Sequence, residues 1–316
     1  MGCWIRVLKV ILTSSVTKKK MIFGENYLKG EDDLEITITG TKYLSSIKDQ
    51  FTINIYNLTY NEMNDIILGK YYDAEVWCGY RNGSVSKVFK GSVIYVSNDR
   101  YELNTNRCII LCGNKYIAQY GQKKMSLSLN SGMNLWDVAN FILRRQGLKN
   151  YKIDERLKTR YIKEVESINS SPQSWLENFA SKNNLLLNVD STSLKDITIL
   201  SSYKTNNRYI ELKNNDILLV NGYPKITSEG LSLSVLPTFN FMPGDVIKID
   251  NSIINTSVSE NNSSYFSNSI FIDMDGRYMI YQVDYELDNM DGDFICNLKT
   301  KARSLYGRIR GGDNEQ

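Results

Sequence analysis

The stretch from Ile47 to Ser97 constrains the fold of this chain more than any other part of the sequence. In Gln50–Tyr56 apolar and polar residues alternate, which is the two-residue period of a half-buried strand. Thr59 and Glu62 then have the spacing of a capping box, so we expect a short helix to begin there. Gly69 fits the left-handed residue that would end this helix.

Two further strands follow the predicted helix. Asp73–Tyr80 and Val85–Val96 are separated by Arg81-Asn82-Gly83-Ser84, and an Asn-Gly pair at such a place is typical of a hairpin turn. No polar side chains in this stretch converge on a pocket. The stretch therefore predicts a sheet with one small helix at an end, which is a structure suited to holding a shape.

The spacing of apolar residues divides the rest of the chain into strand-rich and helix-rich parts. Strand-like runs separated by turns predict an antiparallel barrel or sandwich in the first part and a second β region in the last third. Between them the period becomes helical, with one helix starting at Asn134 or Ser131 and a second at Ser171-Pro172. The expected parts are a first β domain with one short helix at 1–120, a small α+β module at 121–205, a second β domain at 206–305 and a flexible tail at 306–316.

The predicted fold class is therefore α+β, mainly β. The two β regions also show a weak sequence similarity to each other. Gly91–Leu103 precedes a hairpin that ends in Cys112, and Arg277–Leu287 precedes a hairpin that passes Cys296. Chance similarity between hairpins and duplication of a β domain are both compatible with this pattern.

The sequence contains no histidine, which excludes Ser-His-Asp and Cys-His catalysis, histidine-ligated zinc and an imidazole pH switch. Glycine-rich phosphate loops are also absent from the sequence. Asp273–Gly276 and Asp288–Asp293 resemble fragments of calcium loops, but both lack the closing glutamate, and Asp-Gly pairs are typical of tight turns. We therefore predict no catalytic, cofactor-binding or metal-binding residue, no cofactor and no enzymatic activity.

The five cysteines form no disulfide framework. Cys108 and Cys112 lie on one predicted strand, about 13 Å apart, which is beyond disulfide reach. Cys3, Cys78 and Cys296 stand singly in apolar runs, which favours assembly in a reducing compartment. A net charge of +3 is too small to indicate nucleic acid or an anionic membrane as a partner, and no apolar run approaches the ~20 residues of a membrane span.

Two other functions are compatible with the composition. The chain has 21 tyrosines and four tryptophans, which suit a carbohydrate- or peptidoglycan-binding β module, although we expect Trp136 and Trp175 in the core. A wall hydrolase would need a pair of carboxylates about 5 to 9.5 Å apart. None of the 35 acidic residues is singled out for that role by its sequence context.

Two stretches of the sequence, at residues 57–91 and 224–284, each contain a series of short motifs. In the first, a strand ends at an Asn-Leu corner, a short helix follows, and a Gly-Tyr strand pairs with a Phe-x-Gly strand. In the second, a Pro…Thr…Gly strand precedes a Leu-x-Pro…Pro-Gly-Asp turn and a closing hairpin. The residues concerned are Asn57, Leu58, Gly79, Tyr80, Phe89, Lys90, Gly91, Pro224, Thr227, Gly230, Leu236, Pro237, Pro243, Gly244, Asp245, Val283 and Asp284. In this order the chain resembles the baseplate hub proteins of contractile-tailed bacteriophages and phage-tail-like bacteriocins, the tail-tube-like hub family. Asp284-Tyr285 departs from the family, whose members often have histidine there.

The resemblance implies a fold of two tail-tube-like antiparallel β-barrel domains with the α+β module between them. It also implies a homotrimeric ring in which three chains supply six similar domains and adapt a six-fold tail tube to a three-fold central spike. The implied partners are a second and third copy of the chain, the tail tube protein and the central spike protein. Contacts with the tape measure, a baseplate wedge or LysM-type tail proteins are compatible with this role, and DNA would be only passing cargo. The implied location is the baseplate of a virion tail assembled in the host cytoplasm, with no membrane anchor.

Overall fold

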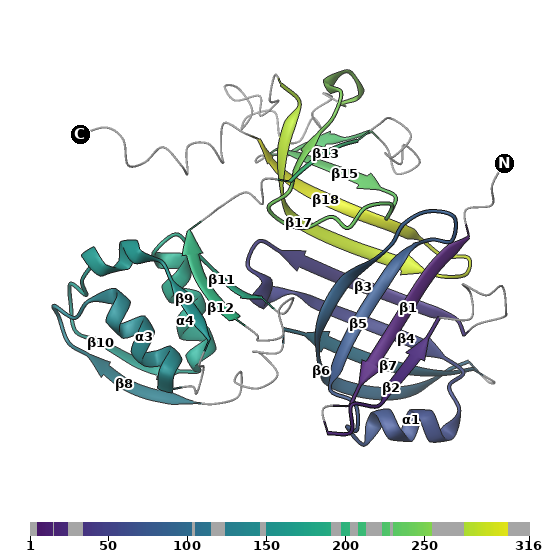
Figure 1. The fold of residues 1–316 in the computed structure, drawn as a ribbon, viewed down its shortest axis with the longest axis horizontal. Coiled ribbons are helices and arrows are strands. Elements are labelled where there is room, and N and C mark those ends of the chain that lie inside the picture. The colour runs from purple at the N-terminus through teal and green to yellow at the C-terminus, as the bar shows by residue number, and fades with distance from the viewer. Residues whose placement is uncertain are drawn as a thin grey trace. The chain divides into compact units, whose positions relative to one another are not determined.

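The structure of this chain is a computed structural model. It describes residues 5–14, 16–24, 34–102, 105–114, 124–145, 150–190, 197–202, 208–212, 223–227, 230–254 and 275–302. The chain divides into two compact units (Figure 1). The larger unit comprises residues 1–44, 50–112 and 204–316, and the smaller unit comprises residues 45–49 and 113–203.

The larger unit is built on one sheet that has 13 strands among the described residues. The strands from the first third are β1 (Arg6–Thr13), β2 (Lys20–Phe23), β3 (Ile36–Tyr43), β4 (Gln50–Tyr56), β5 (Asp73–Tyr80), β6 (Val85–Glu102) and β7 (Thr105–Gly113). Those from the last third are β13 (Tyr209–Glu211), β14 (Lys225–Ile226), β15 (Leu231–Val235), β16 (Val246–Lys248), β17 (Arg277–Asp288) and β18 (Phe294–Ala302). One α-helix, α1 (Tyr60–Ile67), lies at one end of this sheet (Figure 1).

Strands from the two ends of the chain join in the middle of the sheet. The strand order is β14-β15-β18-β17-β3-β4-β7-β6-β5-β1-β2, with β16 pairing with both β13 and β17. β17 lies antiparallel to β3, and the pairing runs from Gln282 opposite Tyr43 to Asp288 opposite Thr37. Within the described residues the path is open, because β2 and β14 are its two ends, and no closed barrel forms.

The long strand β17 changes its partner along its length. Its first residues pair with β16, where Met279 lies opposite Val246. The register against β18 then shifts between Ile280 and Gln282, which marks a bulge, and from Gln282 onward β17 pairs with β3. Since a bulge bends a strand and increases its local twist, it lets one strand serve two parts of the sheet.

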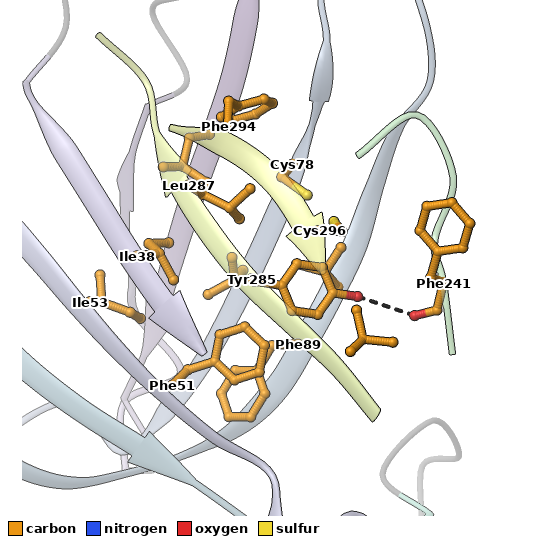
Figure 2. Close-up of a cluster of buried hydrophobic side chains, with 14 of the residues drawn as sticks. Ile38, Phe51, Ile53, Cys78, Phe89, Phe241, Tyr285, Leu287, Phe294 and Cys296 are labelled. Carbon is orange, nitrogen blue, oxygen red and sulfur yellow. Dashed lines mark hydrogen bonds between the residues drawn. The ribbon is translucent and has the colours of Figure 1, made fainter. Parts of the chain in front are cut away.

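One hydrophobic core fills the inner face of the sheet in this unit. The rings of Phe51 and Phe89 stack with centroids 4.2 Å apart, and the Tyr285 ring lies 5.6 Å from that of Phe51 (Figure 2). The buried hydroxyl of Tyr285 donates a hydrogen bond of 3.1 Å to the carbonyl oxygen of Phe241. Gly40 leaves room for this packing, because a Cβ atom there would lie 2.3 Å from the ring of Phe51.

Helix α1 begins and ends where the sequence predicts. The hydroxyl of Thr59 accepts a hydrogen bond from the backbone N–H of Glu62, and the Glu62 carboxylate accepts one from the N–H of Thr59. Met63 and Ile66 are buried in the core, and Gly69 follows the helix with a φ of 68°. The capping box and the left-handed glycine are confirmed.

The smaller unit packs two α-helices against short strands. Its α-helices are α3 (Leu135–Arg145) and α4 (Pro172–Lys182), with 3-10 turns at Ser46–Lys48 and Glu155–Thr159. Its strands are β8 (Met125–Leu129) paired with β10 (Glu166–Ser170), and β11 (Leu185–Asp190), β12 (Ile197–Ser202) and β9 (Tyr151–Ile153) in a second sheet. Asn134 accepts hydrogen bonds from the first N–H groups of α3, and Ser171 caps α4. Trp175 and Phe179 are buried in its core with their rings stacked 4.7 Å apart.

The prediction of an α+β, mainly β fold is confirmed. Several element boundaries shift by a few residues, and β6 is longer than expected because it continues past Val96 to Glu102. The tail predicted at 306–316 lies outside the described residues. The division into two tube-like β domains and an intervening module stays a prediction.

Candidate interaction surfaces

The described residues offer neither a cluster of metal ligands nor a membrane-spanning helix. No group of three or more His, Cys, Asp or Glu side chains in this part of the chain could hold a metal ion. Among the described helices, none is long and apolar enough to cross a bilayer. The expectation that no catalytic, cofactor or metal residue exists stays a prediction. The features that point to function are instead two surfaces of the larger unit.

The first surface is the turn between β17 and β18, residues 288–293, which we call the clasped turn. The Nη1 atom of Arg6 lies 3.2, 2.9 and 2.6 Å from the carbonyl oxygens of Asp288, Met290 and Gly292. Its guanidinium carbon also lies 5.6 Å from the centre of the Phe294 ring. The guanidinium of Arg6, near the start of the chain, therefore donates to three carbonyl groups of a turn near the end of the chain. Hydrogen bonds from a charged donor are stronger than those between neutral groups.

Side chains of the turn itself add to this restraint. Asn289 is 3% exposed, and its side chain accepts a hydrogen bond from the N–H of Ile36 (2.7 Å) and donates one to the oxygen of Leu34 (2.9 Å). The carboxylate of Asp288 accepts a hydrogen bond of 2.7 Å from the N–H of Met290. A Cβ atom at Gly292 would lie 2.4 Å from a carboxylate oxygen of Asp288, so a glycine fits best there.

Three side chains of the clasped turn are exposed to solvent. Met290 is 36% exposed, and Asp291 and Asp293 are exposed beside it. The segment that resembled a calcium-loop fragment is thus a hairpin turn, and it displays one apolar side chain between carboxylates. Next to it, the ring of Tyr80 packs edge-on against Phe294 at 5.5 Å. Burial raises the pKa of Tyr80 to about 12, against a smaller lowering by the charge of Arg6.

The second surface lies where α1 leads into β5, and we call it the apolar end surface. Its members are apolar side chains that are exposed although large: Val16, Ile67, Leu68, Tyr72 and Ile94. Val16 is 86% exposed and Leu68 is 71% exposed. Clusters of exposed apolar side chains with a polar rim often mark protein interaction sites.

Backbone hydrogen bonds bring the three segments of this surface together. The N–H of Tyr72 donates to the oxygen of Thr13 (3.1 Å), and the N–H of Val93 donates to the oxygen of Tyr72 (2.7 Å). The turn between β1 and β2, the segment after α1 and the middle of β6 are therefore neighbours. Lys18 and Lys19 in the β1–β2 turn and Lys20 at the start of β2 are exposed beside these apolar groups.

The ends of the sheet are a further feature of this unit. In the described part of the chain, β2 pairs only with β1, and β14 pairs only with β15. An unpaired strand edge is a template for pairing with another chain. β14 has two residues and β2 has four, so both edges are short.

Solved structures with a similar fold include bacteriophage tail proteins. The 43 kDa tail protein of prophage MuSo2 from Shewanella oneidensis matches with a TM-score of 0.53 and 10% sequence identity, over 94% of this chain and 98% of that protein. A tail protein from Neisseria meningitidis MC58 matches with a TM-score of 0.51 and 10% identity, over 94% and 96% of the two chains. The chain has the fold of these tail proteins.

The tail-protein fold also occurs in a secretion system. The Escherichia coli c3393 protein, a component of the type VI secretion system with structural similarity to the T4 bacteriophage tail proteins gp27 and gp5, matches with a TM-score of 0.52 and 10% identity. That match covers 85% of this chain and 73% of the E. coli protein. No protein-family model matches the sequence, and no curated protein matches it either. At the level of the fold, these structures confirm the resemblance inferred from the order of the motifs.

The sequence motifs predicted parts of the tail-protein fold, but they predicted neither of the two surfaces. Asn57 forms the expected corner with a φ of 57°, and Asp245 of the Pro-Gly-Asp turn is 1% exposed and accepts a hydrogen bond of 3.0 Å from the N–H of Met242. Arg6 carried no signal in the sequence, because 286 residues separate it from Gly292. The run of three lysines was visible, but the exposed apolar groups beside it were not.

Proposed function

We propose that this chain is a structural hub of a phage or phage-like contractile tail and that it works as a homotrimeric ring. The observation that carries the proposal is the extent of the shared fold, which covers 94% of this chain and 98% of the Shewanella tail protein. A fold shared over whole chains, including both compact units, supports a shared kind of role more than a match of one common β domain would.

In the proposed ring, each chain contributes two tube-like β regions, from residues 1–120 and 206–305. Three chains then present six similar units to a six-fold tube, while the opposite face seats a three-fold spike. Structures of PdpA–VgrG complexes also share the fold, with TM-scores of 0.53 to 0.56 at 9% identity over 54% to 65% of those chains. Assembly with another protein in those complexes supports a protein partner for this chain, and we propose that this partner is the spike. The chain would act by shape and contact, without catalysis, in a baseplate assembled in the host cytoplasm.

The experiment that tests the ring is a measurement of mass and shape in solution. Light scattering of the purified chain should give roughly 109 kDa, which is three times the 36.3 kDa of one chain. Negative-stain images should show rings, and addition of the cognate tube or spike protein should give a larger complex. A chain that stays monomeric at all concentrations and in the presence of those proteins would overturn the proposal.

A second candidate is a carbohydrate-binding module of a tail tip. The observation in its favour is that several tyrosines are exposed by more than half: Tyr60, Tyr72, Tyr95, Tyr161, Tyr209 and Tyr223. Tyrosine rings of this kind can pack against sugar faces. Co-sedimentation with purified peptidoglycan distinguishes the candidates, because a hub without this activity remains in the supernatant.

A further inference from the structure

We propose that the clasped turn of one copy docks on the apolar end surface of the next copy. This inference rests on the proposed ring and names the contact that would form it. Met290 would enter the apolar group around Leu68 and Tyr72, and the carboxylates beside Met290 would face the lysines of the β1–β2 turn. The occupant is a second copy of this chain, because the two surfaces complement each other in both polarity and charge.

The charges of the two surfaces have opposite signs. The clasped turn carries three carboxylates, those of Asp288, Asp291 and Asp293, against the one guanidinium of Arg6. Beside the apolar end surface, Lys18 and Lys19 of the β1–β2 turn and Lys20 at the start of β2 are exposed, whereas Lys70 is paired with Asp65. Complementary potentials of this kind select the partner and raise the rate of encounter.

The clasped turn is also already ordered before it meets a partner. Arg6 donates hydrogen bonds to its backbone, and the Asn289 side chain accepts one from the backbone N–H of Ile36. The Asp288 carboxylate accepts one from the N–H of Met290. A loop that is rigid in its bound shape loses little conformational entropy when it binds. The exposed side chain of Met290 is unbranched and adaptable, which suits a contact with a shallow apolar surface.

The positions of the two surfaces require a head-to-tail contact. Arg6 begins strand β1 and touches the clasped turn, whereas Thr13 ends β1 and touches Tyr72 of the apolar end surface. Along this eight-residue strand the two surfaces are about 23 Å apart. Two different surfaces of one subunit can meet only in a heterologous contact, and such a contact closes into a ring when the rotation between copies allows it.

Reversal of charge on each side separately provides the test. The variants are D291K/D293K on the turn and K19E/K20E on the apolar end surface, and the third variant combines all four substitutions. Each pair alone places like charges together and should weaken association at least tenfold in analytical ultracentrifugation. The combined variant restores opposite charges and should associate within about threefold of the unaltered chain. The control K152E/K163E alters two exposed lysines of the smaller unit by the same net charge and should leave association unchanged.

The outcomes separate this contact from the ring itself. If the unaltered chain is monomeric at all concentrations and also in the presence of the tube or spike protein, the proposed ring fails and the contact fails with it. If the unaltered chain forms trimers that neither reversal weakens, the ring stands and the contact is wrong. Loss of association that the combined variant does not restore also overturns the contact. Loss of binding to the tube protein by L68S or M290S, with trimers intact, would assign these surfaces to that partner instead and overturn the proposal.

Discussion

The Nη1 atom of Arg6 lies 2.6 Å from the carbonyl oxygen of Gly292, which follows it by 286 residues in the chain. This contact fixes the first strand of the sheet to the last hairpin. Both partners belong to the larger compact unit, in which residues from the first and last thirds of the chain share one hydrophobic core.

We expect Arg6→Met to lower the free energy of unfolding by about 1–3 kcal/mol, because carbonyl groups of the turn lose their charged donor. Urea denaturation measures the change. The control is Lys248→Met, which removes an ion pair with Glu211 that is exposed on both sides and should cost less than about 0.5 kcal/mol. Equal stability of the two variants would contradict the importance of the clasp.

We expect Gly40→Ala to destabilise the chain by about 1–3 kcal/mol, since the added methyl group would overlap the ring of Phe51. Thermal or urea unfolding measures the effect. Gly83→Ala is the control, because the nearest atoms to a Cβ there lie 3.7 Å away, and it should be close to neutral. Phe51→Leu in the Gly40→Ala background should recover part of the loss, and no recovery would argue against the proposed overlap.

We expect Tyr285→Phe to lower the free energy of unfolding by about 1–2 kcal/mol, because the buried carbonyl oxygen of Phe241 loses its donor. The substitution keeps the ring that packs on Phe51, so the packing itself is preserved. Tyr60→Phe removes a hydroxyl from a ring that is 77% exposed and should have no measurable effect. A Tyr285→Phe protein as stable as the unaltered chain would show that water can replace the hydroxyl.

We expect the buried thiols to be unreactive in the folded chain at pH 8. Burial raises the pKa of Cys78 from its ordinary 9.0 to about 12 and that of Cys108 to about 11, so very little of the reactive thiolate is present. Labelling with iodoacetamide in a Cys3→Ser background, followed by mass spectrometry, measures this. Fast labelling of Cys78 without denaturant would mean that the core around β5 opens easily.

The same raised pKa values give a direction for alkaline stability. The unfolded thiols ionise above about pH 9, whereas the folded thiols stay neutral until higher pH, so ionisation favours the unfolded chain. The contribution of these groups to stability is therefore complete below pH 9 and is lost as the pH rises toward 11 or 12. Urea midpoints between pH 7 and pH 10.5 measure it, and Cys78→Ala should show a shallower decline above pH 9 than the unaltered chain. A decline of equal slope would assign the loss to other groups.

The sequence by itself determined the local elements and their order. Thr59 and Glu62 lie close enough in the chain to define a helix start, and the alternation in Gln50–Tyr56 defines a strand with one buried face. The sequence also predicted that Ser171 caps the N-terminus of α4 and that one face of α4 is apolar. These features depend on residues within one or two turns of each other, so short patterns encode them.

Only the tertiary structure decided which distant strands meet. Residues more than 200 positions apart meet in the pairing of β3 with β17 and in the hydrogen bond from Arg6 to Gly292. The change of partner at Gln282 depends on the first of these pairings. Such pairings follow from the fit of many side chains in one core and from the register that this fit imposes. No short pattern contains that information, and for this reason the sequence indicated the elements of the sheet but neither of the surfaces that the sheet assembles.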